Sequence, residues 1–478
     1  MTLGRILSLA VFLRILGAIF NPGFLSYDDY QSVIRLVIPA QNISGIGWIV
    51  QESELRSPLV RIVLFFLSSM GYSLGLEDPI HQLRLVYLFV GLTSILSVYL
   101  AYRSFEILGR IREARIAATV LSLHFFMPYL NTRVMFENIG MLPFFASIYF
   151  CFHYFYKIKN KSFSKWTHLL IYLSVALLGI ASVARPQVGA IILIWPLIFF
   201  IKFLKQKKIA LLKPLGHVVL SGVLVFLIIG FVDQYLRGSF HQTLRLYFEY
   251  NMAHSKDYGV KPFYYYLPVL LGLVQFPFLI RFKGWPNFKE KYADLLPFIL
   301  SFILFFALHS LVGHKEERFL YPTLPLVFVL ISPWIAHLWE SGCQRHLQLL
   351  GIANVIMGVA ICLSPAQWNV VGLVKHFEGQ ANVGKIISYK DSVGMYPLAY
   401  SREPLPAIQY MEEKSMDTLQ TNDSLVVRKD YLEAFVNESQ LTETASFCPG
   451  PLESFVIFLN PKKNRRRDCL HIFQLKKT

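Results

Sequence analysis

The chain has 478 residues, of which 54% are hydrophobic, 15% aromatic and only 16% charged. Soluble domains carry about 25% charged residues, so this composition excludes a soluble protein and indicates a polytopic membrane protein. The formal net charge of +16 does not indicate a nucleic-acid-binding protein. The lysines and arginines gather in short loops between apolar runs, which is the positive-inside pattern of membrane proteins.

Apolar stretches of roughly 15–20 residues recur along the chain and predict transmembrane helices. About eleven are expected: residues 6–20, 83–102, 116–130, 139–156, 169–183, 188–203, 218–232, 264–280, 295–311, 320–338 and 349–363. The first follows Arg5 as a signal peptide would. No small-residue cleavage site follows it, so we interpret it as a retained span.

A twelfth apolar stretch, residues 59–74, decides the topology. Basic loops lie at residues 103–115, 157–165, 202–213 and 281–291. Such loops face the cytosol. If the chain starts with Arg5 in the cytosol, the first basic loop faces the cytosol only when an even number of spans precedes it. Residues 6–20 and 83–102 already supply two spans, so the stretch at residues 59–74 should not cross. We predict an interfacial or re-entrant helix within a long first extracytoplasmic loop, residues 21–82. The predicted transmembrane domain is residues 1–363.

The tail, residues 364–478, has a different composition and predicts a small mixed α/β domain on the extracytoplasmic side. The expected strands are residues 383–389, 424–427, 455–459 and 470–475, with a helix at 431–437. A disulfide between Cys448 and Cys469 is possible if the tail is extracytoplasmic. The basic run at residues 462–467 is either a solvated turn or a contact for lipid headgroups.

Residues 314–318 are five ionisable residues in a row between two apolar segments. Such a run is costly in hydrocarbon, so it should lie at the membrane–water boundary, either as a solvated loop with interfacial anchors or as a binding site for a charged headgroup. Under the predicted topology the same extracytoplasmic face receives the pair Asp28 and Asp29, and the cations Arg56, Arg133 and Arg185.

Residues 314–322 read H-K-E-E-R-F-L-Y-P. This run resembles the signature of glycosyltransferase family 22, the mannosyltransferases that use dolichyl-phosphate mannose to build N-glycan and GPI-anchor precursors. The similarity includes Tyr27-Asp28-Asp29-Tyr30-Gln31, Leu55-Arg56-Ser57 and Tyr258-Gly259 with Pro262, in the family's order. It covers roughly residues 1–340.

The resemblance implies a GT-C-type, all-α polytopic fold and an inverting sugar transfer in a single displacement. Such a transfer needs a base for the acceptor hydroxyl and cations for the leaving phosphate. One of Asp28 and Asp29 is the candidate base, and the sequence leaves open which. The donor phosphate is assigned to His314, Lys315 and Arg318. Supporting roles are assigned to Glu316, Glu317, Arg56, Arg133, Arg185 and Tyr258.

We therefore predict an enzyme that moves mannose, or a related hexose, from a polyprenyl or dolichyl phosphate to a lipid-linked glycan. The active site is expected on the lumenal or periplasmic face of an endoplasmic reticulum or bacterial inner membrane. No cofactor is predicted, because the sequence holds neither a G-x-x-x-x-G-K nucleotide loop nor a His/Cys metal cluster. A transporter or flippase of lipid-linked saccharides is the alternative, although transporters place ionisable groups near the membrane midplane. A catalytically inactive relative acting as a subunit is a third possibility.

Overall fold

The computed structural model describes residues 1–38, 46–51, 55–162, 164, 166–206, 212–257, 259–280, 287–390, 392–414, 419–436, 438, 440–459, 464 and 467–476. The chain divides into two compact units. The helical unit consists of Met1–Leu13, Val50–Val60 and Val90–Gly358. The mixed unit consists of Arg14–Ile49, Arg61–Phe89 and Val359–Thr478.

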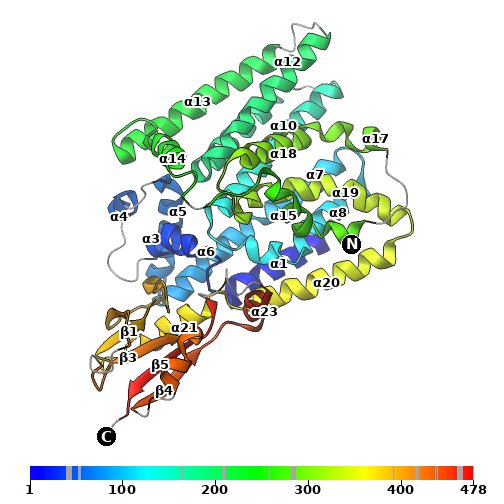
Figure 1. Cartoon of the computed structure of the whole chain (residues 1–478). Coiled ribbons are helices and arrows are strands. Elements are labelled where there is room, and N and C mark those ends of the chain that lie inside the picture. Colours follow the sequence, from blue (N-terminus) through cyan, green and yellow to red (C-terminus); the bar gives the residue numbers. More distant parts are fainter. Residues whose placement is uncertain are drawn as a thin grey trace. The chain divides into compact units, whose positions relative to one another are not determined.

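The helical unit is built around α10, which packs against α7, α11, α18 and the short helix η7 (Figure 1). Its elements are α7 (Ile95–Glu106), α8 (Ile111–Leu123), α9 (Met127–Leu130), α10 (Phe136–Lys159), α11 (Leu169–Ala184), η3 (Pro186–Leu193), α12 (Ile194–Gln206), α13 (Leu212–Arg237), α14 (Gln242–Ala253), η5 (Phe263–Tyr265), α15 (Tyr266–Leu273), α16 (Phe276–Leu279), α17 (Phe288–Tyr292), η6 (Ala293–Leu295), α18 (Leu296–Leu311), η7 (Glu317–Thr323) and α19 (Leu324–Glu340). The helices α1 (Leu3–Phe20), α4 (Ile46–Gln51), α5 (Pro58–Ser73), α6 (Pro79–Thr93) and α20 (Gln344–Leu363) contribute residues to both units.

Within the described residues, seven helical segments are long and apolar enough to cross a membrane. They are Leu3–Phe20, Pro79–Glu106, Phe136–Lys159, Lys213–Arg237, Phe288–Leu311, Glu317–Glu340 and Gln344–Phe377. Helices suit this environment because they satisfy their own backbone hydrogen bonds in lipid. The predicted helical membrane architecture is confirmed, whereas the count of eleven spans stays a prediction.

Two of the apolar stretches differ in the structure from a continuous helix of full membrane length. Residues 116–130 are not one helix, because α8 ends at Leu123 and α9 begins at Met127. Pro128 has no N–H to donate to the carbonyl of His124, which favours a break at this point. The stretch at residues 59–74 forms α5, whose 16 residues fall short of the roughly 20 that a span requires.

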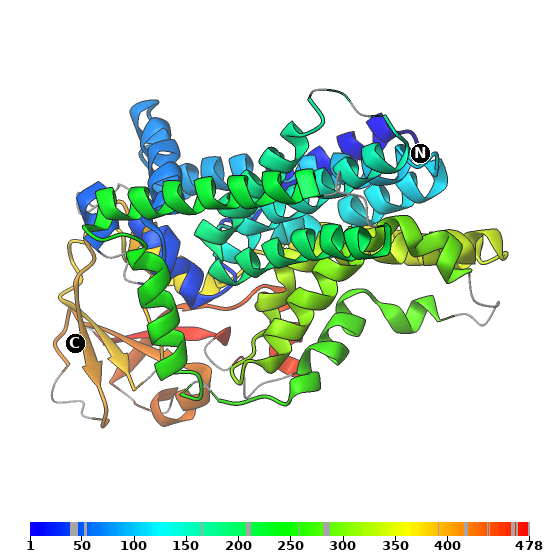
Figure 2. The same cartoon turned by 90° about the horizontal axis from the view of Figure 1, so that it is seen from above.

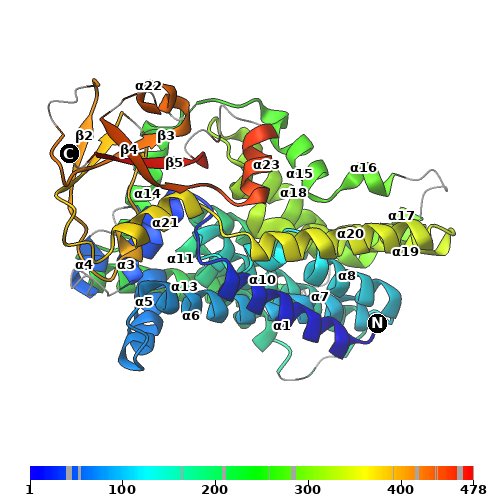
Figure 3. The same cartoon turned by 90° about the horizontal axis from the view of Figure 1, so that it is seen from below.

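The mixed unit contains a five-stranded sheet with the order β2-β1-β3-β5-β4, drawn from yellow to red in Figures 1 and 2. Its strands are β1 (Lys385–Tyr389), β2 (Ala407–Met411), β3 (Ser424–Arg428), β4 (Leu441–Phe447) and β5 (Leu470–Leu475). β1 pairs in parallel with β2 and β3, whereas β5 is antiparallel to β3 and β4. Helix α21 (Trp368–Phe377) packs on β4 and β5 (Figure 3).

The prediction of a mixed α/β tail is confirmed, but one of its elements was wrong. Residues 455–459 belong to the helix α23 (Pro451–Leu459), not to a strand. Pro451 at the first helical position and Glu453 in the first turn favour this helix. The sequence reading also missed β2 and β4. Both are edge strands with largely exposed side chains, so they lack the apolar pattern of the fully buried β3.

The disulfide between Cys448 and Cys469 is present and joins the end of β4 to the start of β5. The short helix α22 (Glu433–Val436) covers the sheet through Phe435, which is buried with Leu425 and Phe473. The N-terminal part of the mixed unit follows α1 with the short elements α2 (Tyr27–Asp29), the π-helix η1 (Tyr30–Ile34) and α3 (Arg35–Val37). π-Helical turns are rare in proteins, and those that occur often lie at functional sites.

Candidate functional site

The predicted acidic pair begins the helix α2, and its two carboxylates have different surroundings. Asp29 is 4% exposed, and its carboxylate accepts hydrogen bonds from the backbone N–H of Ser26 at 3.0 Å and from Ser26 Oγ at 3.1 Å. This is the contact that a capping box makes at the start of a helix. Asp28 is exposed. The structure therefore gives Asp29 a local structural task and leaves Asp28 at the surface of the mixed unit.

In the helical unit, Glu137 in the first turn of α10 lies within electrostatic reach of three arginines. Arg185, which follows the last residue of α11, places Nη1 3.1 Å from Glu137 Oε1. Both side chains are almost fully buried, 2% and 6% exposed. The other two are Arg318 of η7 and Arg56, which precedes α5. We call Arg56, Arg185, Arg318 and Glu137 the arginine cluster.

Aromatic rings orient the three guanidinium groups. The guanidinium carbon of Arg185 is 4.6 Å from the ring centre of Phe319, and that of Arg318 is 5.7 Å from the same ring. Arg56 lies 5.0 Å from Tyr247 and 5.5 Å from the ring of Phe136. Such stacking holds a planar cation without consuming its N–H donors.

The arginine cluster has unused donors and an excess of positive charge. Arg56 Nη1 and Arg185 Nη2 are buried and have no hydrogen-bond partner among the described residues. Burial, and then the like charge of Arg185, lower the pKa of Arg56. The cluster as defined holds three guanidinium groups and one carboxylate, and Glu316 pairs with Arg318. A buried cationic site with free N–H groups is suited to an anion.

The charged run that precedes α19 folds largely onto itself. Glu316 bridges Arg318 at 2.7 Å and His314 Nε2 at 2.9 Å. Glu317 accepts a hydrogen bond from the Tyr265 hydroxyl at 2.5 Å. Arg318 thus joins the arginine cluster, and His314 is linked to Arg318 through a shared carboxylate.

Lys315 takes a different position from its neighbours. It is 3% exposed, and its ammonium donates to the carbonyl of Lys261 at 3.1 Å and to the carbonyl of Val312. Burial lowers the pKa of this ammonium. Two of its three N–H donors are therefore used on the backbone, which connects the segment at Lys261 to the end of α18.

Of the remaining predicted residues, Arg133 is 1% exposed and donates from Nε and Nη2 to Thr132 Oγ1 at 3.2 and 2.9 Å. Its guanidinium also lies 4.4 Å from the ring of Tyr129. Tyr258 lies outside the described residues. Sequence reasoning did not assign a site role to Glu137. Its signal is an acidic residue in the first turn of a long apolar helix, where a charge is costly unless it has a partner.

A largely apolar cavity of about 390 Å³ lies between α11, η3, α13 and α14 of the helical unit. Its lining includes Ser57 and Pro186, the residues that follow Arg56 and Arg185 in the chain. It also includes Thr243 and Leu244, which lie one helical turn before Tyr247 on α14. The hydrophobic pattern does not indicate this cavity, because its walls come from separate apolar helices.

Residues 47–385 match the model of the Alg9-like mannosyltransferase family. The chain belongs to this family. It is 25% identical over 380 residues to GPI mannosyltransferase 3 of Debaryomyces hansenii, a match that covers 76% of this chain and 65% of that protein. It is 26% identical over 337 residues to alpha-1,2-mannosyltransferase ALG9 of Arabidopsis thaliana, covering 66% of this chain and 54% of that protein. The chain thus spans between half and two thirds of the length of these Alg9-like relatives.

The solved structure of ArnT from Cupriavidus metallidurans bound to undecaprenyl phosphate has a similar fold. The TM-score is 0.58 at 10% sequence identity, and the match covers 98% of this chain and 97% of that one. This likeness confirms the GT-C-type fold that the motif predicted for this Alg9-like chain.

Proposed function

We propose that this chain is an inverting mannosyltransferase. It moves mannose, or a related hexose, from a polyprenyl or dolichyl phosphate donor to a lipid-linked glycan acceptor. Its membership of a mannosyltransferase family supports the reaction class, and the undecaprenyl phosphate bound to ArnT supports the donor class. The observation that carries the proposal is the arginine cluster, in which Arg185 pairs with the buried Glu137 and Arg56 and Arg318 lie within electrostatic reach of it.

The reaction explains why cations are needed. The acceptor hydroxyl attacks the anomeric carbon of the sugar, and the bond from that carbon to the phosphate oxygen breaks, leaving its electron pair on the phosphate. The phosphate changes from a diester with one negative charge to a monoester with two. Arginines that strengthen their hold as this charge develops stabilise the transition state. The free N–H groups of Arg56 and Arg185 suit this task.

The acceptor hydroxyl must lose its proton to a base, and we assign this role to Asp28. Asp29 is committed to the Ser26 backbone N–H and hydroxyl, whereas Asp28 is exposed. The hydrogen bonds from Ser26 stabilise the ionised form of Asp29 and so lower its basicity, and its burial keeps it from a substrate, whereas an exposed carboxylate can be reached by an acceptor hydroxyl. Attack by the deprotonated hydroxyl in a single displacement inverts the anomeric centre.

The apolar cavity supports a donor that carries an isoprenoid chain. Its lining is dominated by residues such as Val175, Leu178 and Val225. Ser57 and Pro186, which directly follow Arg56 and Arg185 in the chain, also line it. We assign it to the isoprene units that follow the donor phosphate, because apolar chains gain by leaving water for such a wall. A transporter or flippase, the alternative from the sequence, finds no support in the family match or the relatives.

The protein is an integral membrane protein, and we propose that its site faces the lumen or periplasm. The Cys448–Cys469 disulfide supports this side for the tail, since disulfides persist in oxidising compartments. Single cysteines introduced at Asn160 and at Gly313 test the topology with an impermeant thiol reagent. Labelling of the first from the cytosol and of the second from the opposite side is expected. Cytosolic labelling at Gly313 would overturn the side assigned to the site.

Transfer of radiolabelled mannose from polyprenyl-phosphate mannose to lipid-linked acceptors tests the reaction. Asp28→Asn should lower turnover by about 10²–10⁴-fold while substrate binding survives, because the amide keeps the shape but is not a base. Asp29→Asn is the matched control: it weakens a helix cap worth about 1 kcal/mol and should retain most of the turnover. Near-parent turnover in Asp28→Asn at equal membrane abundance would refute the assigned base.

A further inference from the structure

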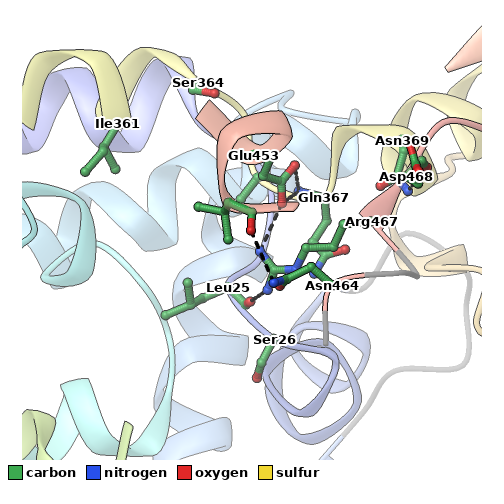
Figure 4. A network of polar contacts seen from close by, with 12 residues as sticks. Leu25, Ser26, Ile361, Ser364, Gln367, Asn369, Glu453, Asn464, Arg467 and Asp468 are labelled. Carbon is green, nitrogen blue, oxygen red and sulfur yellow. Dashed lines mark hydrogen bonds and ion pairs between the residues drawn. The ribbon is translucent and has the colours of Figure 1, made fainter. Parts of the chain in front are cut away.

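Arg467, the last residue of the basic run in the tail, connects two parts of the mixed unit that are far apart in sequence. Its Nη1 lies 3.1 Å from Glu453 Oε1, and its Nη2 donates to the carbonyl of Leu25 at 2.9 Å (Figure 4). Leu25 lies three residues before Asp28 and directly before Ser26, the N-cap residue of α2. The other basic residues of the run predicted as a solvated turn or a headgroup contact, Lys462, Lys463, Arg465 and Arg466, lie outside the described residues. Arg467 itself binds the segment that presents Asp28.

Glu453 is itself held in place, so it can orient Arg467. Its side chain is 9% exposed, and both of its carboxylate oxygens accept from the backbone N–H of Gln367 at 3.0 Å. Gln367 precedes α21, and Glu453 lies in the first turn of α23. Figure 4 shows Arg467 lying between Glu453 and Leu25.

The start of the same segment is bound to the chain that follows α20. The Asn21 amide donates to the carbonyls of Ile361 at 3.0 Å and Ser364 at 2.5 Å, and its oxygen accepts from the N–H of Ala366 at 3.0 Å. At Gly23 an added Cβ would lie 1.7 Å from the carbonyl oxygen of Ala366. The backbones approach so closely here that only glycine fits.

The C-terminal domain also contacts both sides of α2. Tyr400 donates its hydroxyl to the carbonyl of Pro22 at 3.0 Å, and the N–H of Ala399 donates to the Tyr30 hydroxyl at 2.9 Å. The rings of Tyr30 and Tyr400 stack with centres 6.3 Å apart. Among these contacts, that of Arg467 with Leu25 is the one made by a charged side chain, and it lies nearest to the turn that starts α2.

We infer that the Glu453–Arg467 pair is a positioning device by which the C-terminal domain holds the α2 segment, and with it Asp28, in its working geometry. The inference rests on the proposed role of Asp28 as the base. A carboxylate that must meet one hydroxyl proton tolerates little displacement, since a shift of about 1 Å can cost about 10²-fold in rate. Arg467 is thus a positioning residue that acts through Asp28.

The test compares Arg467→Ala and Arg467→Lys with the parent, and Arg402→Ala serves as the matched control. Arg402 belongs to the same unit but forms an exposed pair with Glu77, the two side chains being 58% and 54% exposed. Hydrogen–deuterium exchange of peptides covering residues 21–37 is measured on the purified full-length protein. Loss of a hydrogen bond from a charged group should raise exchange in this segment by about 10- to 100-fold in Arg467→Ala. Arg402→Ala should leave exchange there unchanged.

Transfer assays on the same samples supply the second readout. Arg467→Ala should lower kcat by about 10- to 100-fold with little change in KM for the donor, because the base is displaced while the phosphate site is intact. Arg467→Lys should recover part of both readouts, since an ammonium can still donate to one partner. If Arg467→Ala does not accumulate in membranes, Arg467→Lys alone carries the comparison.

The outcomes separate this inference from the proposed function. Parent-like exchange at residues 21–37 in Arg467→Ala would overturn the positioning role, whatever Asp28 does. In the double variant Asp28→Asn/Arg467→Ala, turnover no lower than in Asp28→Asn supports action through Asp28. A further drop that multiplies the two single effects would overturn it. Parent-like turnover in Asp28→Asn would instead refute the proposed base, and with it the catalytic purpose of the pair.

Discussion

Removing Arg185 should affect stability and donor use for two different reasons, and the arginine cluster allows them to be separated. In Arg185→Ala the buried side chain of Glu137, 6% exposed, loses the partner that lies 3.1 Å away. Removing one member of a buried ion pair costs about 3–5 kcal/mol of stability. The missing guanidinium also removes the proposed phosphate contact, which would be worth about 1.5–3 kcal/mol, or about 10- to 100-fold in kcat/KM for the donor.

The variant Glu137→Gln removes the same ion pair from the other side. It should lower the thermal midpoint, because Arg185 becomes a buried cation without its carboxylate, yet it should keep donor use near the parent level. The double variant Arg185→Ala/Glu137→Gln contains neither charge, so most of the lost stability should return while donor use stays low. Thermal unfolding in detergent and transfer kinetics over a range of donor concentrations measure the two effects. Recovery of donor use together with stability in the double variant would show that Arg185 has only a structural role.

Arg318→Ala should likewise lower kcat/KM for the donor by about 10- to 100-fold, with partial recovery in Arg318→Lys because an ammonium cannot reproduce a bidentate fork; an unchanged donor dependence would remove Arg318 from the phosphate site. Replacing Cys448 and Cys469 by serine should lower the free energy of unfolding by about 3 kcal/mol for a loop of this length. Thiol reduction of the parent should lower the thermal midpoint by as much as the serine replacements do, and an unchanged midpoint would show that the disulfide does not stabilise the fold. Burial raises the pKa of Glu453, and Arg467 opposes that rise, so the protonated form stabilises the fold and this contribution is lost as the pH rises through the raised pKa. The thermal midpoint of Arg467→Ala should therefore fall more steeply than that of the parent as the pH rises above the ordinary pKa of a glutamate side chain, and parallel profiles would contradict this reasoning.

The hydrophobic pattern by itself determined the class of the protein. Apolar runs such as residues 139–156 had to become helices, because lipid offers no partner for an unpaired backbone group. The run at residues 314–322 indicated the family, and the composition change near residue 364 located the sheet-containing tail. The pairing of Cys448 with Cys469 was also readable, since these are the two cysteines that lie in this polar tail. The capping contact of Asp29 was within reach too, because the Ser26-x-x-Asp29 spacing is that of a capping box.

Only the tertiary structure decided how the charged side chains are used. Lys315 and Arg318 stand three residues apart, yet one binds backbone carbonyls and the other joins the arginine cluster. Arg467 appeared in a run of similar cations, but its partners, Glu453 and Leu25, lie 14 and 442 residues away. Local patterns report the period of a helix or strand and the need to bury apolar surface. They do not report which distant carboxylate or carbonyl meets a cation, because packing between separate segments sets that encounter.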